Sequence, residues 1–414
     1  MHYRRQVWFK PSLVVHEGHR KVSWLELFYD LFFVVTISQL AHKLHGELDW
    51  YSLIKYTVLF IPVWWLWIGS TFYMERFETE GLDTRLIFFL MLFPVSGLAV
   101  FAYDGLGTSS FGFVASYAFG RLILSVLWLR ATLHNEVFRP TGRAYLTGFT
   151  TSLILLTTSL FLTETVRLPL FAASLFIDLV TPWFTLRLQE KLPRFNRHKL
   201  PERFGLFIII VLGESAVGVV SGFAASRQIT IESALNAVMG ITLGFALWWV
   251  YFDFIGRRSA RPRMLSSISW SFLHLPLAMG IAATGAATSN AIAKSQGLIS
   301  GDIAPLLAGS AAATLLVVGL LEMVLDPDAD EPTHPVISPG LKIGFGVLLA
   351  AFVLFFPHAS PAVTLAIILA CMVVIMLYGL WVWFTEGHQR ETKGGRLQGL
   401  LRVRRDIRRH AKQE

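Results

Sequence analysis

Residues 361–385 read PAVTLAIILACMVVIMLYGLWVWFT, a stretch that contains no charged side chain. A helix of about 20 mainly apolar residues crosses the roughly 30 Å hydrocarbon core of a bilayer, so this stretch is long enough to span. Eleven further stretches of the same kind precede it, and we expect each to form a helix. They lie at about 23–44, 51–74, 84–103, 111–130, 145–163, 166–188, 201–222, 231–253, 264–288, 303–325 and 340–356. The sequence therefore predicts an all-α, polytopic membrane protein with about twelve transmembrane helices.

The composition of the chain argues against several other classes of protein. Hydrophobic residues make up 54% of the 414 positions and charged residues only 15%, whereas soluble domains carry about 25% charged residues. Apolar residues come in long blocks, which argues against a coiled coil, a collagen-like chain or a disordered chain. Cys371 is the single cysteine, so an intrachain disulfide and a CxxC metal or redox motif are excluded. The short connection between Pro357 and Pro361 fits either a tight outer turn or a re-entrant break.

The location of the positive charge predicts the orientation in the membrane. The amino terminus, the even-numbered loops and the carboxyl tail hold 30 of the 36 Lys and Arg residues. This asymmetry follows the positive-inside rule, which places both termini in the cytoplasm and the protein in the cell membrane. It also accounts for the net charge of +8 without nucleic acid as a partner.

Two halves of six spans repeat one order of short motifs. Residues 26–28 (ELF) resemble 202–204 (ERF), 64–67 (WWLW) resemble 248–251 (WWVY), and Pro94 matches Pro276. Six is an even number, so the halves enter the membrane in the same orientation, related by an axis along its normal. The predicted parts are a cytoplasmic amino-terminal segment (1–22), two parallel six-helix repeats (23–188 and 201–385), a cytoplasmic connector (189–200) and a basic cytoplasmic tail (386–414). A substrate path is expected between the repeats, unless an old duplication has had its path filled.

Two charged residues of the first half lie at matching depth near the middle of the membrane. Arg121 in the fourth span and Asp178 in the sixth are each some ten to twelve residues from the outer surface, about 15 to 18 Å at 1.5 Å per residue. A charge at this depth costs about 2.5 to 3.5 kcal/mol unless it has a partner or water. We therefore expect an ion pair between them, which either serves transport or only locks two helices together.

The first spans of the two halves carry most of the remaining polar candidates. Asp30 lies about seven residues inside the cytoplasmic edge, and Glu214 lies beside small residues on one face of the seventh span. If the halves superpose, Glu214 is the counterpart of Ser38, and the two first spans face each other across the repeat axis. Near cytoplasmic ends, snorkelling or contact with water explains Glu75, Asp253 and Glu322. The ion-path or intramembrane polar candidates are Glu26, Asp30, Ser38, Gln39, Arg121, Asp178, Glu214, Ser215 and His274.

The pattern names no catalytic residue, cofactor or metal ligand set. His274 is a candidate proton relay or a packing histidine, and no phosphate loop, nucleophile elbow or HExxH motif occurs. We therefore do not expect an enzyme. The tail beyond residue 386 is rich in Arg, with apolar residues near helical spacing between the arginines. This pattern fits a helix on anionic inner-leaflet lipids or a disordered basic tail. The remaining expected partners are the lipid bilayer and a small cation or proton, and homo-oligomerisation is left open.

Two strings resemble the signatures of the bacterial low temperature requirement A family. They are residues 20–34 (RKVSWLELFYDLFFV) and 200–215 (LPERFGLFIIIVLGES), and the resemblance extends over roughly 15–390. It implies a polytopic cytoplasmic-membrane protein whose family is named for a cold-growth phenotype.

A weaker resemblance concerns mechanism. Residues 28–30 (FYD), the Trp-rich second span and Pro94 are similar to the six-helix unit of the endolysosomal potassium channel family, which opens with Phe-Ser-Asp. The resemblance implies that Asp30 takes the place of the motif Asp and that the first span faces a pore. The departures are Tyr29 in place of Ser and the lack of an Asp in the second half. We expect a small-ion channel or transporter; the alternative is a non-transporting structural or regulatory membrane protein that supports growth in the cold.

Overall fold

The computed structural model describes most of the chain and is built from helices. The described residues are 22–44, 50–77, 81–193, 195–196, 198–224, 230–256, 258–295, 302–326 and 333–387, with Pro11, Leu13 and Val14. The first half contains α1 (Trp24–His42), α2 (Trp50–Arg76), α3 (Leu82–Phe101), α4 (Ser110–His134), α5 (Arg139–Leu160), α6 (Glu164–Phe184) and the short α7 (Leu186–Gln189). The second half contains α8 (Lys199–Ala224), α9 (Ile231–Tyr251), α10 (Met264–Ser295), α11 (Ala304–Val324), α12 (Ile337–Phe355) and α13 (Pro361–Val382). Helices α9 and α13 continue as π-helical turns at Phe252–Gly256 and Trp383–Gly387.

Among the described residues, eleven helices are long and apolar enough to cross a bilayer. This confirms the predicted class, an all-α polytopic membrane protein. The span expected at 145–163 forms a helix, α5, but this helix is not one of the eleven because eight of its 22 residues are Ser or Thr. Several of these hydroxyls donate back to the carbonyl four residues earlier, as in Thr147 to Arg143 and Thr151 to Thr147. Their hydrogen bonds are thus satisfied within the helix.

Local sequence signals set where several helices begin. Ser23 caps α1 in a reciprocal capping box, in which the Ser23 amide donates to Glu26 at 2.7 Å, an arrangement that satisfies otherwise free amides at a helix start. Ser360 caps α13, whose first residue is Pro361. Helix α12 ends at Phe355, so the connection expected near Pro357 is a tight turn. An exposed hydrogen bond between His358 and Asp302, 2.7 Å long, lies at this turn.

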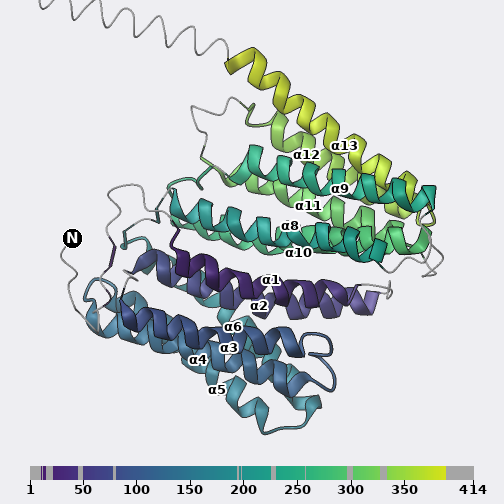
Figure 1. Ribbon diagram of the computed structural model, residues 1–414. Coiled ribbons are helices and arrows are strands. Elements are labelled where there is room, and N and C mark those ends of the chain that lie inside the picture. The colour runs from purple at the N-terminus through teal and green to yellow at the C-terminus, as the bar shows by residue number, and fades with distance from the viewer. Residues whose placement is uncertain are drawn as a thin grey trace, which may run out of the picture.

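The two halves pack side by side (Figure 1). In the first half, α1 packs on α3, α3 on α4, α4 on α5, and α5 on α6. In the second half, α8 packs on α10, α10 on α11, and α11 on α12, while α13 packs chiefly on α9. Contacts between the halves are made by α1 and α2 with α8 and α10. The first helices of the two halves therefore lie at the interface.

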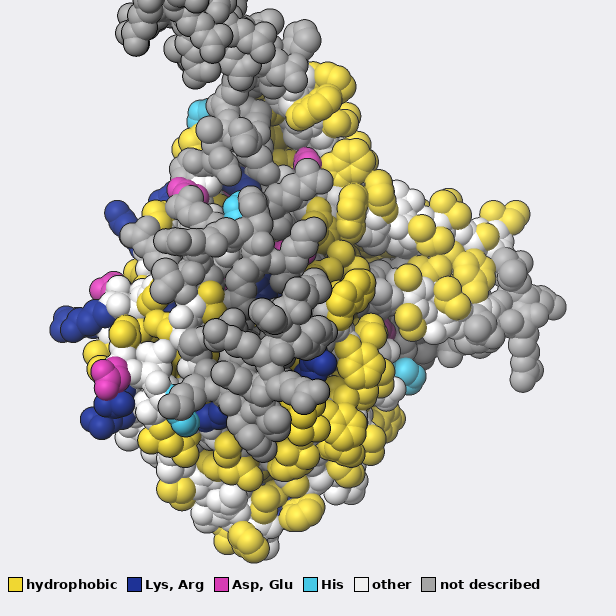
Figure 2. Space-filling view, turned by 60° about the vertical axis from the view of Figure 1, so that its left-hand side comes forward, with side chains coloured by type: hydrophobic (Ala, Val, Ile, Leu, Met, Phe, Trp, Pro, Cys, Tyr) yellow, Lys and Arg dark blue, Asp and Glu magenta, His cyan; other side chains and the backbone are white. Residues whose placement is uncertain are grey.

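The outer surface of the bundle is apolar along the helix flanks. Large side chains such as Val220, Phe176 and Leu354 are exposed there. Figure 2 shows hydrophobic side chains over much of the described surface on the right of the view and Lys and Arg side chains at the left. A continuous exposed apolar surface of this kind is expected when lipid, and not water, surrounds the protein.

Candidate functional site

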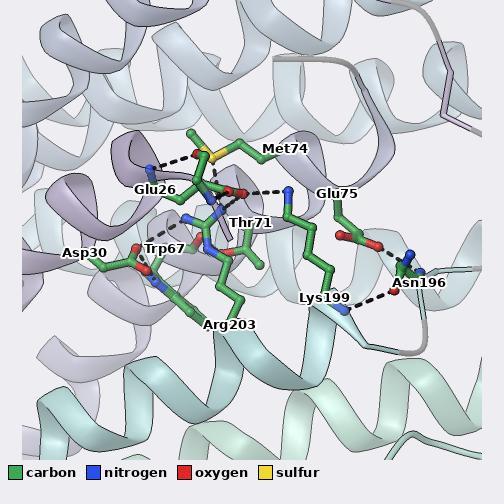
Figure 3. A network of polar contacts seen from close by, with 10 residues as sticks. Glu26, Asp30, Trp67, Thr71, Met74, Glu75, Asn196, Lys199 and Arg203 are labelled. Atoms are coloured by element: carbon green, nitrogen blue, oxygen red, sulfur yellow. Dashed lines mark hydrogen bonds and ion pairs between the residues drawn. The ribbon is translucent and has the colours of Figure 1, made fainter. Parts of the chain in front are cut away.

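A buried charge network joins the first helices of the two halves. Arg203 on α8 donates through one terminal nitrogen to Glu26 Oε1 at 2.8 Å and through the other to Asp30 Oδ1 at 3.2 Å. Lys199 Nζ lies 2.9 Å from the same Glu26 oxygen. All four side chains are nearly inaccessible, and Figure 3 shows them between α1 and α8. We call these four residues the inner network.

Helix α2 supplies the remaining contacts of the inner network. The indole of Trp67 donates to Asp30 Oδ1 at 3.0 Å, and Arg203 also lies 2.9 Å from the sulfur of Met74. The Trp67 ring stacks on Phe207 of α8 with 4.1 Å between centroids. Two carboxylates thus face two cations in an aromatic setting. A balanced and hydrogen-bonded set of this kind suits a lock between helices.

The ion pair expected in the first half is present. Arg121 Nη2 on α4 lies 2.6 Å from Asp178 Oδ1 on α6. The Tyr117 hydroxyl donates to the other oxygen of Asp178 at 2.9 Å, and the guanidinium lies over the Phe149 ring at 4.4 Å. This pair is also balanced, and all its contacts stay within the first half.

A third buried pair contains Glu322, for which snorkelling or contact with water was expected. That interpretation is wrong, because the Glu322 side chain is buried and paired with Lys342. Lys342 on α12 donates to Glu322 Oε2 of α11 at 2.8 Å and to Ser338 Oγ at 2.8 Å. The Lys342 ammonium also lies 3.6 Å from the centre of the Phe254 ring. Glu75 is likewise buried, and its carboxylate accepts from the Asn196 amide at 2.8 Å. Both carboxyls are held by protein groups, Glu322 by a side chain of α12 and Glu75 by the backbone of the segment after α7.

Glu214 differs from these paired carboxyls. It is 5% exposed on α8, and the Ser38 side chain of α1 hydrogen-bonds to it. Tyr56 of α2 lies close enough to interact with it electrostatically, and its own hydroxyl donates to the Met279 carbonyl at 2.8 Å. Within the described part of the chain, no Lys or Arg forms an ion pair with Glu214. Among the residues with a described position, it is thus a buried carboxyl between the halves without a cation to balance it.

The backbone of α8 and α10 comes unusually close beside Glu214. A Cβ added to Gly285 would lie 2.9 Å from the Ser215 amide nitrogen, and one added to Gly218 would lie 2.8 Å from the Gly285 carbonyl oxygen. Glycine at both positions permits this approach. The hydroxyl of Ser215 is buried and has no hydrogen-bond partner among the described residues.

The other predicted candidates take no direct part in the Glu214 site. The His274 ring is fully buried, with Nδ1 2.7 Å from the Trp270 carbonyl and Nε2 3.1 Å from the Tyr251 hydroxyl. A carbonyl only accepts, so Nδ1 carries the proton and Nε2 accepts from Tyr251. His274 is therefore fully hydrogen-bonded. Gln39 is exposed, and it makes no hydrogen bond to another described residue.

Three members of these networks were not among the sequence candidates. Arg203 and Lys199 belong to a basic stretch beside the connector, so they were counted as loop charges, and Lys342 was assigned to a loop in the same way. The predicted repeat is the signal that could have pointed to Arg203. It matches Glu26 with position 202, which is next to Arg203 in the chain. The tail from residue 388 onward, where contact with anionic lipids was expected, lies outside the described residues.

Comparison with known proteins agrees with the family resemblance of residues 20–34 and 200–215, the two segments that contain Glu26, Asp30 and Arg203 of the inner network. A family model described as bacterial low temperature requirement A protein matches residues 21–383, a range that includes both α1 and α8. An uncharacterized protein of Rhizobium meliloti (strain 1021) is 27% identical over 285 residues, which cover 63% of this chain and 67% of that protein. No solved structure matches significantly, and the weaker resemblance to the endolysosomal potassium channel unit stays a prediction. The chain belongs to the bacterial low temperature requirement A protein family.

Proposed function

We propose that this membrane protein transports a proton or a small monovalent cation along a path between its two halves, with Glu214 as the binding group. The observation that carries the proposal is the contrast between Glu214 and the other buried charges. Glu26, Asp30 and Asp178 each face a guanidinium, whereas Glu214 is buried and forms no ion pair with any Lys or Arg that the structure describes. A lone carboxylate is costly to bury. A bound proton or cation would remove that cost.

The position of Glu214 supports the same role. It lies 15 residues after the first residue of α8 and 10 before the last, about 22 Å and 15 Å along the helix at 1.5 Å per residue. The Ser38 side chain hydrogen-bonds to it from α1, and Tyr56 of α2 interacts with it electrostatically, so two helices of the other half contribute to its surroundings. Membrane transporters commonly bind their substrate near the midplane, where two structural halves meet.

We infer as well that the halves are parallel repeats with α1 and α8 beside their common axis. Contacts between these helices join residues 177 and 173 apart, and Ser38 meets Glu214 at an offset of 176, the same as that between the matched Glu26 and Glu202. Equivalent positions meet only close to a twofold axis. The shared packing order, first helix on third, third on fourth and fourth on fifth, also supports a repeat. The charge bias of the loops supports a cell-membrane location with both termini in the cytoplasm.

A non-transporting structural or regulatory role is the second candidate, and the balanced inner network favours it because such networks lock helices. Reconstitution of the purified protein into liposomes separates the two. A fluorescent reporter inside the vesicles would follow H⁺, K⁺ and Na⁺ in turn under an imposed gradient. Flux of one ion well above that of protein-free liposomes is the expected result. If folded protein gives no flux of any of the three, in either direction, the transport proposal fails.

A further inference from the structure

A second site lies at the predicted cytoplasmic end of the bundle, away from Glu214. A cavity of about 480 Å³ opens between the segment after α7 and the start of α10. Its lining includes Leu192 and Asn196 of the first segment and Arg261, Arg263 and Trp270 of the second. Ligand cavities of small organic molecules span about 300 to 1,000 Å³, so this volume can hold a headgroup and part of its apolar body.

The lining is suited to an anion. Arg261 and Arg263 outnumber the one carboxylate that lines the cavity, Glu190. Arg261 is anchored, because its Nε donates to the Leu325 carbonyl at 3.2 Å, while Arg263 is exposed at the rim. The 32-residue α10 begins here at Met264, and the amides of a first helical turn carry partial positive charge.

One buried donor at the cavity has no acceptor. Trp270 is 1% exposed and lines the cavity, and its Nε1 has no hydrogen-bond partner among the described residues. The ring is fixed by Phe204 and His274, with centroid distances of 4.5 and 4.3 Å. A buried indole N–H normally has a partner. An oxygen atom of a ligand in the cavity would provide the acceptor.

Most of the remaining lining is apolar and reaches the surface. Leu192, Phe195, Leu200 and Met264 contribute to the walls, and Leu265 at the edge is 52% exposed. Headgroup phosphates of the inner leaflet lie at this level of a membrane protein, and basic pockets between helices on this side bind anionic headgroups. We propose that the cavity binds the phosphate of an anionic phospholipid, with Arg263 and the Trp270 N–H as phosphate ligands.

The site would couple the lipid to the interface between the halves. The segment that carries Leu192 and Asn196 follows the first half, and α10 belongs to the second. The backbone amide of Asn196 also donates a hydrogen bond to the Glu75 carboxylate of α2 at 2.8 Å. A phosphate held between these segments would therefore stabilise one arrangement of the halves.

Binding can be measured on the full chain in detergent by thermal stabilisation. The probes are dioleoylphosphatidylglycerol, dioleoylphosphatidylcholine and water-soluble glycerol 3-phosphate, each titrated against wild type, Trp270→Phe, Arg263→Gln and, as a matched exposed control, Arg139→Gln. Trp270→Phe removes the N–H together with the five-membered ring of the indole, so the binding of each variant is measured relative to its own unfolding temperature without lipid. Loss of a hydrogen bond to a charged group should weaken binding about tenfold.

The expected result is stabilisation by phosphatidylglycerol but not by phosphatidylcholine, about tenfold weaker in Trp270→Phe and Arg263→Gln and unchanged in Arg139→Gln. Equal stabilisation by glycerol 3-phosphate would support the phosphate site but assign it to a water-soluble source. Equal stabilisation by both lipids, or wild-type affinity in both cavity variants, would overturn the proposal.

Discussion

Removal of the Arg203 guanidinium tests whether the inner network joins the two halves. Arg203→Met keeps a long side chain but removes the 2.8 Å contact with Glu26 and the 3.2 Å contact with Asp30. Glu26 retains Lys199 at 2.9 Å, whereas Asp30 retains, among described residues, only the Trp67 indole. The variant therefore leaves one buried carboxylate without a cation, a change that costs about 3 to 5 kcal/mol in the free energy of unfolding.

A double substitution separates the lost charge pair from any general loss of packing. Asn at position 30 has no charge and can still accept from the Trp67 indole, so Arg203→Met with Asp30→Asn should be more stable than Arg203→Met alone. The coupling between the two positions should be about 1 to 3 kcal/mol. Reversible unfolding in mixed detergent micelles gives the four free energies, with the exposed Arg143→Met as a control that stays within about 0.5 kcal/mol of wild type. A cost below about 1 kcal/mol for Arg203→Met, or simple additivity in the double variant, would show that the Arg203–Asp30 contact does not stabilise the packing of the two halves.

Two further predictions use the same unfolding assay. Gly218→Ala should destabilise the protein by about 1 to 3 kcal/mol because the new Cβ would lie 2.8 Å from the Gly285 carbonyl oxygen, whereas Gly213→Ala in the same helix meets nothing within 4 Å and should be neutral or slightly stabilising. Equal effects of the two alanines would contradict the close approach of α8 and α10. Lys342→Met should cost about 1 to 3 kcal/mol because it removes the 2.8 Å partner of the buried Glu322 carboxylate and leaves the more distant Arg258 at 3.8 Å, and adding Glu322→Gln should recover part of that loss. A double variant no more stable than Lys342→Met would show that the Lys342–Glu322 pair is not what stabilises this region.

The sequence was enough to predict most of the architecture and one of the buried pairs. Apolar stretches specify transmembrane helices because each backbone polar group must be satisfied within the segment, and α5 stands apart because its hydroxyl-rich sequence lowers its hydropathy. The Arg121–Asp178 contact followed from matching depth, a quantity that residue counting provides. Depth does not say which faces of two helices meet. A partner could be predicted here because two opposite charges lie at the same depth.

The inner network could not be predicted from depth and loop charge. Arg203 and Lys199 lie in a basic stretch next to a connector, and the positive-inside rule gives such residues no partner. Their burial comes from the packing of α8 on α1 and from Trp67 of α2, contacts between residues far apart in the chain. Only the repeat offset, applied residue by residue, relates Glu26 to this part of α8. Glu322 was misplaced for the same reason, since its partner Lys342 lies on another helix.

A matched pair of variants tests whether Glu214 binds the transported ion. Glu214 is buried between the halves, whereas Glu202 on the same helix is exposed. Glu214→Gln and Glu202→Gln each replace a carboxyl by an amide of the same size, so wild type and both variants are reconstituted at equal density and their initial rates of ion uptake are compared. We predict a loss of at least about tenfold in Glu214→Gln, equivalent to about 1.4 kcal/mol, with Glu202→Gln unchanged. Wild-type uptake by folded Glu214→Gln would contradict it.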